Sequence, residues 1–416
     1  MNGRSVAPVG YLSLVALVLI ACSTATPTPL AQSPQSPDEY LSNALDWIET
    51  HAVLSGIVSW TIVRKEALAA DPQTIPDTYP VICFALRSLR DVNAWLMVPA
   101  ELTSDYTGFD FIDNVVVMVY PDGPAERAGV RVGDIIKDQS PGPSGTPPCS
   151  DDNKEDSTQL HLTLLRAGQA EPIEITIDKV ADPGFDEGGQ PAGRRLETKG
   201  SAVGYLELPY DTGFHRSYPG TVQQLMRKID RRPVCSWIID LRRTIGGDIW
   251  SYLAAIGPIL GEGDVGGFLY LDRTRELWTY RDGQVSWNGE RRGESFVEGG
   301  IYQPKRATPP VALLIGPGTI AAGELVVVAF HGYPNVRTFG EPTSGAPRLI
   351  LHTELSDGTW IFVSGALAID RSGYPYSGPL RSDEYVITDW TQFGTDQDPV
   401  LNAARDWLET QPECAP

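Results

Sequence analysis

Histidine, cysteine and positive charge are all scarce in this sequence. Among 416 residues there are only five histidines and five cysteines, and they show no CxxC or HxxxH spacing of the kind that holds a metal ion. Lysine and arginine total 33 against 53 acidic residues, which gives a formal net charge of −20. Such a chain repels phosphate backbones and anionic lipid surfaces. We therefore expect no metal, no cofactor and no nucleic-acid partner.

Long apolar runs are scarce too, and the clear one lies near the N-terminus. Residues Val9–Ala21 follow Arg4 and are too short for an ordinary membrane span, which is typical of a signal peptide. The run ends Leu-Ile-Ala-Cys22, which resembles the bacterial lipobox, whose cysteine carries the lipid. We expect a lipoprotein signal peptide over 1–22 and a Ser/Thr/Pro-rich tether over 23–37. The alternative is a short buried helix that ends in cysteine.

The other cysteines bear on the same compartment. Lipidation of Cys22 leaves four cysteines, which can form two disulfides in an exported protein, by three connectivities that the sequence does not decide. They are Cys83, Cys149, Cys235 and Cys414. We expect an exported protein that is held by its lipid anchor alone at the outer face of the cell membrane or cell envelope.

Composition and periodicity divide the rest of the chain into three parts. The 41 glycines and 34 prolines favour many turns and short strands over a helical bundle. Apolar residues at helical spacing predict an N-terminal helical cap over 38–104. Short β-rich runs predict a small domain over 105–180, and a linker is expected over 181–200. Strands that alternate with helices predict an α/β core over 200–416. Its expected strands cover 203–208, 237–241, 311–315 and 336–339, and its expected helices cover 221–229, 321–331 and 396–408.

The segment Tyr120–Ile136 resembles a PDZ domain. It reads YPDGPAERAGVRVGDII, in which Pro-Ala-x-x-Ala-Gly begins the short helix and Gly-Asp-x-Ile closes the next turn. The resemblance implies a site that takes an extended peptide as an added strand, with a glycine-rich loop that binds the peptide carboxylate. The matching residues are Gly108, Phe109 and Phe111, but Asp110 stands where the family usually has glycine. An acid there disfavours a bound carboxylate, so a purely structural PDZ domain is the alternative.

Further segments resemble the C-terminal processing, or tail-specific, serine peptidases. They are GYLELP from Gly204, IIDLRRTIGG from Ile238, GTIAAGE from Gly318 and GEPTSG from Gly340. The chain continues into LSDG and DRSG, as in the branch of that family that lacks a catalytic lysine. The resemblance implies a peptidase-type α/β sandwich core with an inserted β-rich PDZ domain and an N-terminal helical cap.

The catalytic positions that this resemblance assigns do not carry catalytic side chains. Such an enzyme needs a hydroxyl nucleophile and a base that deprotonates it. The nucleophile falls at Ala321, where the family reads Thr-x-Ser-x-Gly-Glu, and the lysine of the Ser-Lys branch falls at Ala346. The histidine of the other branch, in Asp-x-His-Ser, falls at Asn93, which Ala94 follows. Asparagine takes no proton near neutral pH, so nucleophile and base are both missing.

The oxyanion side of the site is present in the sequence. The resemblance assigns the backbone donors for the tetrahedral intermediate to Gly246, Gly247 and Ala322. Without a nucleophile and a base, such donors leave at most a small residual catalysis. We therefore expect a non-catalytic homologue that binds unfolded or C-terminal peptide segments of other proteins.

Two alternatives stay open on sequence alone. The first is an active serine-type endopeptidase that processes protein C-termini, either with a serine lost in this copy only or with a substitute pair of Ser344 and His215 or His352. The second is a scaffold whose PDZ domain and cleft both serve protein assembly at the cell surface. Hydrolysis of an unfolded protein tests the first alternative, and peptide affinity tests the second.

Overall fold

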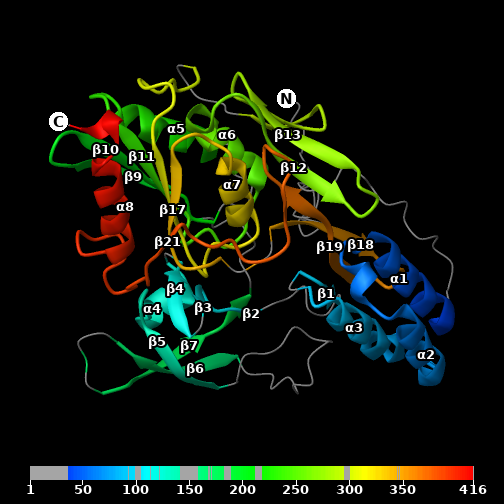
Figure 1. Cartoon of the computed structure of the whole chain (residues 1–416). Coiled ribbons are helices and arrows are strands. Elements are labelled where there is room, and N and C mark those ends of the chain that lie inside the picture. The colour runs from blue at the N-terminus through cyan, green and yellow to red at the C-terminus, as the bar shows by residue number, and fades with distance from the viewer. Residues whose placement is uncertain are drawn as a thin grey trace, which may run out of the picture.

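The computed structural model describes residues 36–415 except 92, 99–104, 113, 121, 141–157, 167–168, 170, 182–188, 211–217, 295–299, 344 and 346. Figure 1 shows an α/β core, a small β module beneath it and a group of helices at its side. The predicted mixed α/β fold class, with N-terminal helices and several sheets, is confirmed. In the described ranges no helix is long and apolar enough to cross a membrane.

A six-stranded sheet forms the centre of the core. Its strands are β9 (Ala192–Glu197), β10 (Ala202–Glu207), β11 (Ser236–Asp240), β16 (Val311–Ile315), β17 (Val336–Gly340) and β21 (Glu384–Tyr385). They lie in the order β21-β17-β16-β11-β10-β9, and every pair is parallel except β10 with β9. All five residues of β11 and of β16 are buried, as expected for a parallel sheet that is covered on both faces.

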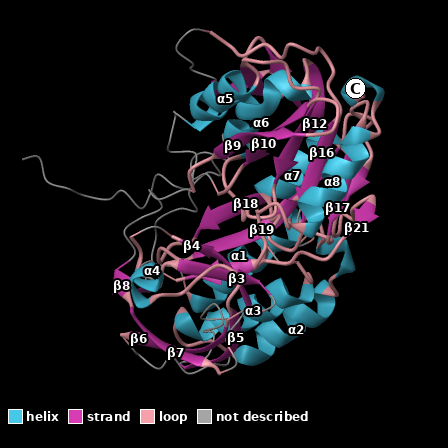
Figure 2. Ribbon diagram, turned by 90° about the vertical axis from the view of Figure 1, so that its left-hand side faces the viewer, coloured by secondary structure: helices cyan, strands magenta, loops and turns pink. Residues whose placement is uncertain are grey.

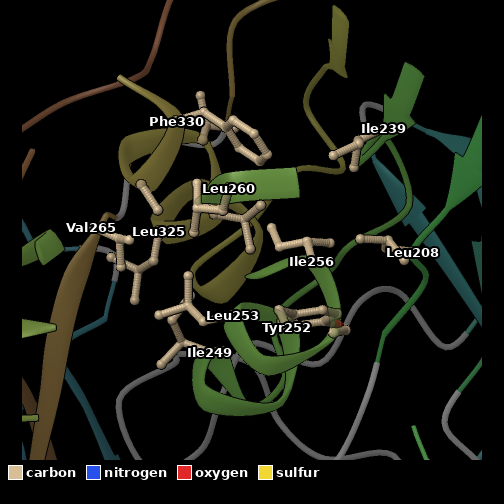
Figure 3. Packing of buried hydrophobic residues seen from close by; sticks show 14 of the residues in the cluster. Leu208, Ile239, Ile249, Tyr252, Leu253, Ile256, Leu260, Val265, Leu325 and Phe330 are labelled. Atoms are coloured by element: carbon tan, nitrogen blue, oxygen red, sulfur yellow. The ribbon is translucent and has the colours of Figure 1, made fainter. Parts of the chain in front are cut away.

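Helices cover both faces of this sheet. They are α5 (Tyr218–Ile229), α6 (Ile249–Leu260), α7 (Ala322–Phe330) and α8 (Pro399–Glu409). The first three share the largest apolar core with one face of the sheet, and α8 packs on the other face. Figure 3 shows Ile256 and Leu260 of α6 among the side chains of this core, together with Leu325 and Phe330 of α7. This packing holds α7 against the sheet and so positions its N-terminus, which begins at Ala322.

A second, antiparallel sheet packs against α6 and α7. Its strands are β1 (Trp95–Met97), β12 (Gly263–Tyr270), β13 (Arg275–Arg281), β14 (Gln284–Trp287), β15 (Glu290–Glu294), β18 (Arg348–Glu354), β19 (Trp360–Ile369) and β20 (Pro375–Tyr376). The order is β1-β19-β12-β13-β14-β15, with β18 and β20 also paired to β19. The sequence analysis does not predict this sheet, because strands such as GDVGGFLY mix glycine and charge with apolar residues. Burial of Phe268 and Trp278 against α6 and its neighbours decides the structure there.

The N-terminal helices pack on the far end of β19. They are α1 (Pro37–His51), α2 (Trp60–Ala70) and α3 (Tyr79–Ser88), with short 3-10 turns at Ser55–Ile57 and Pro76–Thr78. The hydroxyl of Ser36 accepts from the amide of Glu39 and caps α1. Apolar residues of these helices form one cluster with Ile361 and Val363 of β19. The helices are therefore attached to the same sheet that flanks α7.

The small β module has its own core. Its strands are β2 (Asp105–Tyr106), β3 (Phe109–Ile112), β4 (Val115–Val119), β5 (Ile135–Ser140), β6 (Gln159–Leu165), β7 (Ile173–Asp178) and β8 (Val180–Ala181), and its helix is α4 (Pro124–Ala128). A five-stranded sheet runs in the order β3-β4-β5-β6-β7, and β2 pairs with β8. Val116, Leu162 and Ile177 are fully buried in its cluster. Figure 2 shows this module and α1–α3 at one end of the molecule, with α5 and α6 at the other.

Two further expectations can be compared with the structure. The segment 181–200 is not only a linker, because it contains the edge strand β9. Its sequence AGRRLE is rich in arginine and does not show the apolar pattern typical of a strand. Cys235 and Cys414 form a disulfide, which ties the 3-10 turn Pro412–Cys414 to the start of β11. Cys83 is also disulfide-bonded, and Cys149 lies outside the described residues.

Candidate functional site

Ala321, the predicted nucleophile position, lies where β16 passes through a tight turn into α7. The amide of Thr319 donates to the carbonyl of Gly316 at 2.8 Å, and the hydroxyl of Thr319 donates to the carbonyl of Leu241 at 2.9 Å. Ala321 has φ 47° and ψ −105°, a conformation that costs an L-residue on the order of 1–3 kcal/mol. A sharp, strained strand-to-helix turn is the geometry that exposes the nucleophile of many hydrolases. In this chain the turn presents a methyl group.

Glu324 holds this turn in place from within the first turn of α7. The side chain is fully buried, and one carboxylate oxygen accepts from the amide of Ala321 at 3.1 Å. The other oxygen accepts from the hydroxyl of Thr343 at 2.6 Å and from the amide of Gly345 at 2.8 Å. The sequence analysis assigns Glu324 no role in the site. In the structure it joins the start of α7 to the loop at Thr343 and Gly345.

The loop after β11 pairs with the residue that precedes Ala321. The amide of Ile320 donates to the carbonyl of Thr244 at 3.0 Å, and the amide of Gly246 donates to the carbonyl of Ile320 at 3.1 Å. Ile245 and Ile320 form an isolated parallel bridge. This short ladder places the loop of Gly246 beside Ala321.

The backbone amides in this loop differ in what they bond. Gly246 and Gly247 have φ of 105° and 103°, which a residue with a side chain rarely adopts. The amide of Gly246 already donates to Ile320, so this amide is engaged in the structure, contrary to the expectation that it faces an oxyanion. The amides of Gly247 and Ala322 make no hydrogen bond within the described part of the chain. These two stay the predicted donors.

A buried ion network anchors the strand that leads into this loop. Arg242 contacts Asp240 at 2.6 Å and Asp398 at 2.7 Å, and all three side chains are fully buried. Burial lowers the pKa of Arg242, but the charges and hydrogen bonds of both aspartates outweigh burial and raise the pKa above its ordinary value. Burial raises the pKa of Asp398, but its bonds to Arg242 and to backbone amides lower the pKa overall. The sequence DLR at this strand end is therefore structural.

The predicted base position belongs to a different network. Asn93 donates through Nδ2 to the hydroxyl of Ser364 on β19 at 3.2 Å, and its amide donates to Asp91 at 3.1 Å. Asp91 also accepts from the amide and hydroxyl of Ser364 at 2.8 and 2.9 Å and contacts Arg348 at 2.8 Å. Ala94 packs against the apolar cluster of the N-terminal helices. The residues of this motif therefore hold the helices to β18 and β19.

The other candidate residues fall into two groups. His352 lies on β18 and its ring contacts those of Trp360 and Phe362, at centroid distances of 5.3 and 5.8 Å, and burial lowers its pKa. This environment is that of a packed histidine. Four predicted positions lie outside the described residues: Ser344, Ala346, His215 and Cys22. In the described ranges no group of three or more histidine, cysteine or acidic residues is placed to hold a metal ion.

The predicted peptide-binding loop begins β3 in the small β module. Gly108 has φ 82°, and a Cβ there would lie 2.8 Å from Pro124 Cδ, so the turn requires glycine. Phe109 is buried and Phe111 is exposed, and their rings stack with centroids 6.0 Å apart. The hydroxyl of Tyr120 donates to Asp110 Oδ2 at 2.7 Å, and burial raises the pKa of Asp110.

The site therefore combines a strained strand-to-helix turn with an adjacent glycine loop in a mixed α/β core. Residues 202–381 match the model of peptidase family S41. This range contains Gly246, Ala321 and Glu324.

The chain is also similar to curated proteins. Over 192 residues the chain is 28% identical to the nisin-resistance protein of Lactococcus lactis subsp. lactis, covering 45% of this chain and 58% of that protein. Over 359 residues it is 25% identical to the chloroplastic carboxyl-terminal-processing peptidase 2 of Arabidopsis thaliana, covering 77% and 64%. The chain therefore spans about three fifths of the length of these relatives.

Solved structures establish the fold. The photosystem II D1 C-terminal processing protease matches with a TM-score of 0.58 at 18% identity, covering 92% of this chain and all of that chain. A lipoprotein from Streptococcus agalactiae matches with a TM-score of 0.54 at 15% identity, covering 92% and 99%. The Cys235–Cys414 disulfide is typical of proteins that fold in an oxidising, extracytoplasmic compartment.

Proposed function

We propose that this chain is an exported, lipid-anchored member of the S41 peptidases that binds extended peptide segments of other proteins without cleaving them. The observation that carries the proposal is Ala321. Its backbone has the strained conformation of a nucleophile turn, but its side chain has no hydroxyl. A methyl group cannot attack a carbonyl, so the step that would begin peptide hydrolysis has no nucleophile at this position.

The base side supports the same proposal. Asn93 cannot accept a proton near neutral pH, and its side chain is bonded to Ser364. His352, one of the predicted substitute bases, is packed against two aromatic rings. A hydroxyl placed at position 321 would therefore still need a base from elsewhere.

Peptide binding does not need the missing groups. Main-chain hydrogen bonds to a strand edge supply affinity that is independent of a nucleophile. The S41 relatives named above include peptidases that process carboxyl termini, and proteins of this family bind C-terminal peptides through PDZ domains. We assign the same general ligand, an extended peptide, to this chain, through the small β module and the loop at Gly247.

The proposed absence of peptide cleavage is tested by hydrolysis and by labelling. The chain from Asp38 onward, incubated with an unfolded casein-like substrate, is expected to release no fragments, and a serine-directed phosphonate is expected to label no residue. Stoichiometric labelling of any serine would instead identify a replacement nucleophile. That outcome would favour the alternative of an active serine-type endopeptidase.

Restoring catalytic groups tests the same point from the other direction. Ala321→Ser alone is expected to remain inactive, because an unassisted serine is a poor nucleophile. The triple variant Ala321→Ser, Asn93→His, Ala94→Ser is expected to recover trace hydrolysis at most, through backbone donors that are already in place. Robust turnover by the single variant would reveal a base at the site and contradict the proposal.

The lipid anchor is tested separately. Metabolic labelling with a palmitate analogue is expected to tag the protein at Cys22, and Cys22→Ala is expected to release it from membranes. If the variant keeps both label and membrane association, the anchor lies at another residue.

A further inference from the structure

Among the described residues, strand β3 has a free edge and carries an acid, Asp110, that is not paired with a cation. Of the described strands only β4 pairs with β3, which lies at the end of its five-stranded sheet. Asp110, in the middle of β3, accepts one hydrogen bond from the hydroxyl of Tyr120. Within the described residues no arginine or lysine forms an ion pair with Asp110, whereas Asp134 of the same module is paired with Arg166 at 2.7 Å. A half-buried carboxylate without a cation is an unfavourable arrangement that a ligand cation would relieve.

The side chains of β3 alternate between two different surroundings. Phe109 lies opposite Val119 and Phe111 lies opposite Val116. The two phenylalanines lie on one face because side chains alternate along a strand, and their rings are stacked. Asp110 lies opposite Met118, on the other face. A peptide that pairs with the free edge of β3 must follow this alternation, because directly opposed residues in a sheet share a face. Its residues beside Phe109 and Phe111 must be apolar, and its residue beside Asp110 must suit a carboxylate.

A free C-terminus does not suit this strand. A peptide carboxylate at the loop of Gly108 would bind two residues from Asp110 in the sequence, and two like charges repel each other. The net charge of −20 adds to the same effect. Opposite charges directly across two strands are favourable instead.

We propose that the β3 edge binds internal, extended segments with the pattern apolar–basic–apolar, whose lysine or arginine lies opposite Asp110, and that it disfavours free C-terminal carboxylates. The inference rests on the proposed peptide binding and specifies its ligand. It assigns Asp110 as the residue that determines specificity, at a position where the PDZ domains that this module resembles usually have glycine.

Fluorescence anisotropy with the full-length protein tests this assignment. Three labelled decapeptides of otherwise equal sequence are used: a capped peptide with a central Val-Lys-Val, a capped peptide with Val-Glu-Val, and a peptide that ends in a free valine carboxylate. The lysine peptide is expected to bind up to about fivefold tighter than either of the others, which corresponds to the usual free energy of a cross-strand charge pair.

Two isosteric variants locate the effect. Asp110→Asn keeps an acceptor for Tyr120 and is expected to bring the lysine-to-glutamate affinity ratio close to one. Asp178→Asn removes an exposed acid from β7, the opposite edge of the same sheet, and is expected to leave the ratio unchanged. Thermal melts of both variants check that the module stays folded.

The outcomes separate this inference from the proposed function. Equal binding of all three peptides, a preference for the free carboxylate, or a ratio that survives in Asp110→Asn overturns the inference while peptide binding stands. Absence of binding by every peptide to the wild type and to both variants overturns the proposed peptide binding as well.

Discussion

The nucleophile side and the base side of the candidate site differ in what holds them. On the nucleophile side, Ala321 has a strained backbone conformation. The carboxylate of Glu324 accepts a hydrogen bond from the amide of Ala321, and the amide of Gly246 donates to the carbonyl of Ile320. On the base side, Asn93 and Asp91 bond Ser364 and Arg348 and join the N-terminal helices to β19. The first side retains the geometry of a catalytic turn without its chemistry. The second side serves to hold two parts of the fold together.

The comparison shows that the two sides depend on different parts of the chain, one on the backbone and one on a side chain. The turn at Ala321 is built from backbone bonds between β16, α7 and the loop after β11, so it persists whichever side chain stands at 321. The base position depends on its side chain alone, and here that side chain has an amide that satisfies a structural hydrogen bond. Four measurements test this distinction.

The largest expected effect comes from breaking the base side. Arg348→Met leaves Asp91 buried without its cation, and removing one partner of a buried pair costs about 3–5 kcal/mol. Urea denaturation should show this loss in the free energy of unfolding. Arg64→Met, which breaks a half-exposed pair with Asp46 and Glu49, serves as control and should cost about 1 kcal/mol or less. Equal losses in both variants would contradict a structural role for the base side.

On the nucleophile side, Glu324→Gln should cost about 1–3 kcal/mol, because a Gln amide nitrogen cannot accept one of the hydrogen bonds that Glu324 now accepts. The same urea measurement applies. Glu66→Gln on the exposed face of α2 is the matched control and should change little. An unchanged free energy of unfolding in Glu324→Gln would show that the turn does not depend on this carboxylate.

Removing the strain at position 321 should stabilise the protein. Ala321→Gly relieves a conformation that costs about 1–3 kcal/mol and adds the usual glycine entropy of about 0.5–1 kcal/mol, so a gain of about 1 kcal/mol is expected. Ala322→Gly, one residue into α7, should destabilise by about 1 kcal/mol. If Ala321→Gly is destabilising as well, the turn carries no strain.

The smallest effect concerns the far end of α7. Burial lowers the pKa of His331, although Asp370 and Asp383 oppose this shift. A histidine with a lowered pKa contributes stability above its unfolded pKa of about 6.5, and this contribution is lost as the pH falls toward the folded pKa. The free energy of unfolding should therefore fall below pH 6.5, and less so in His331→Gln. Identical pH profiles would show that His331 titrates as in the unfolded chain.

Local pattern was sufficient for the elements around Ala321. The alternation of apolar strands and helices predicted β10, β11, β16, β17 and the helices α5 and α7 close to their observed bounds. The strand-to-helix junction in GPGTIAAGE placed Ala321 at the start of α7, as observed. These features depend on residues that are near one another in the chain, where periodicity and turn chemistry act directly.

The sequence by itself therefore determined the core elements, the missing hydroxyl at Ala321 and the position of the glycine loop. Only the tertiary structure decided the antiparallel sheet, the engagement of Gly246 by Ile320, the three bonds of Glu324 and the pairing of Asp91 with Arg348. The physical reason is separation along the chain. Asp91 and Arg348 are 257 residues apart, and nothing in the local pattern around either residue specifies the other. Burial of two distant surfaces against each other brings such pairs together and gives them their roles.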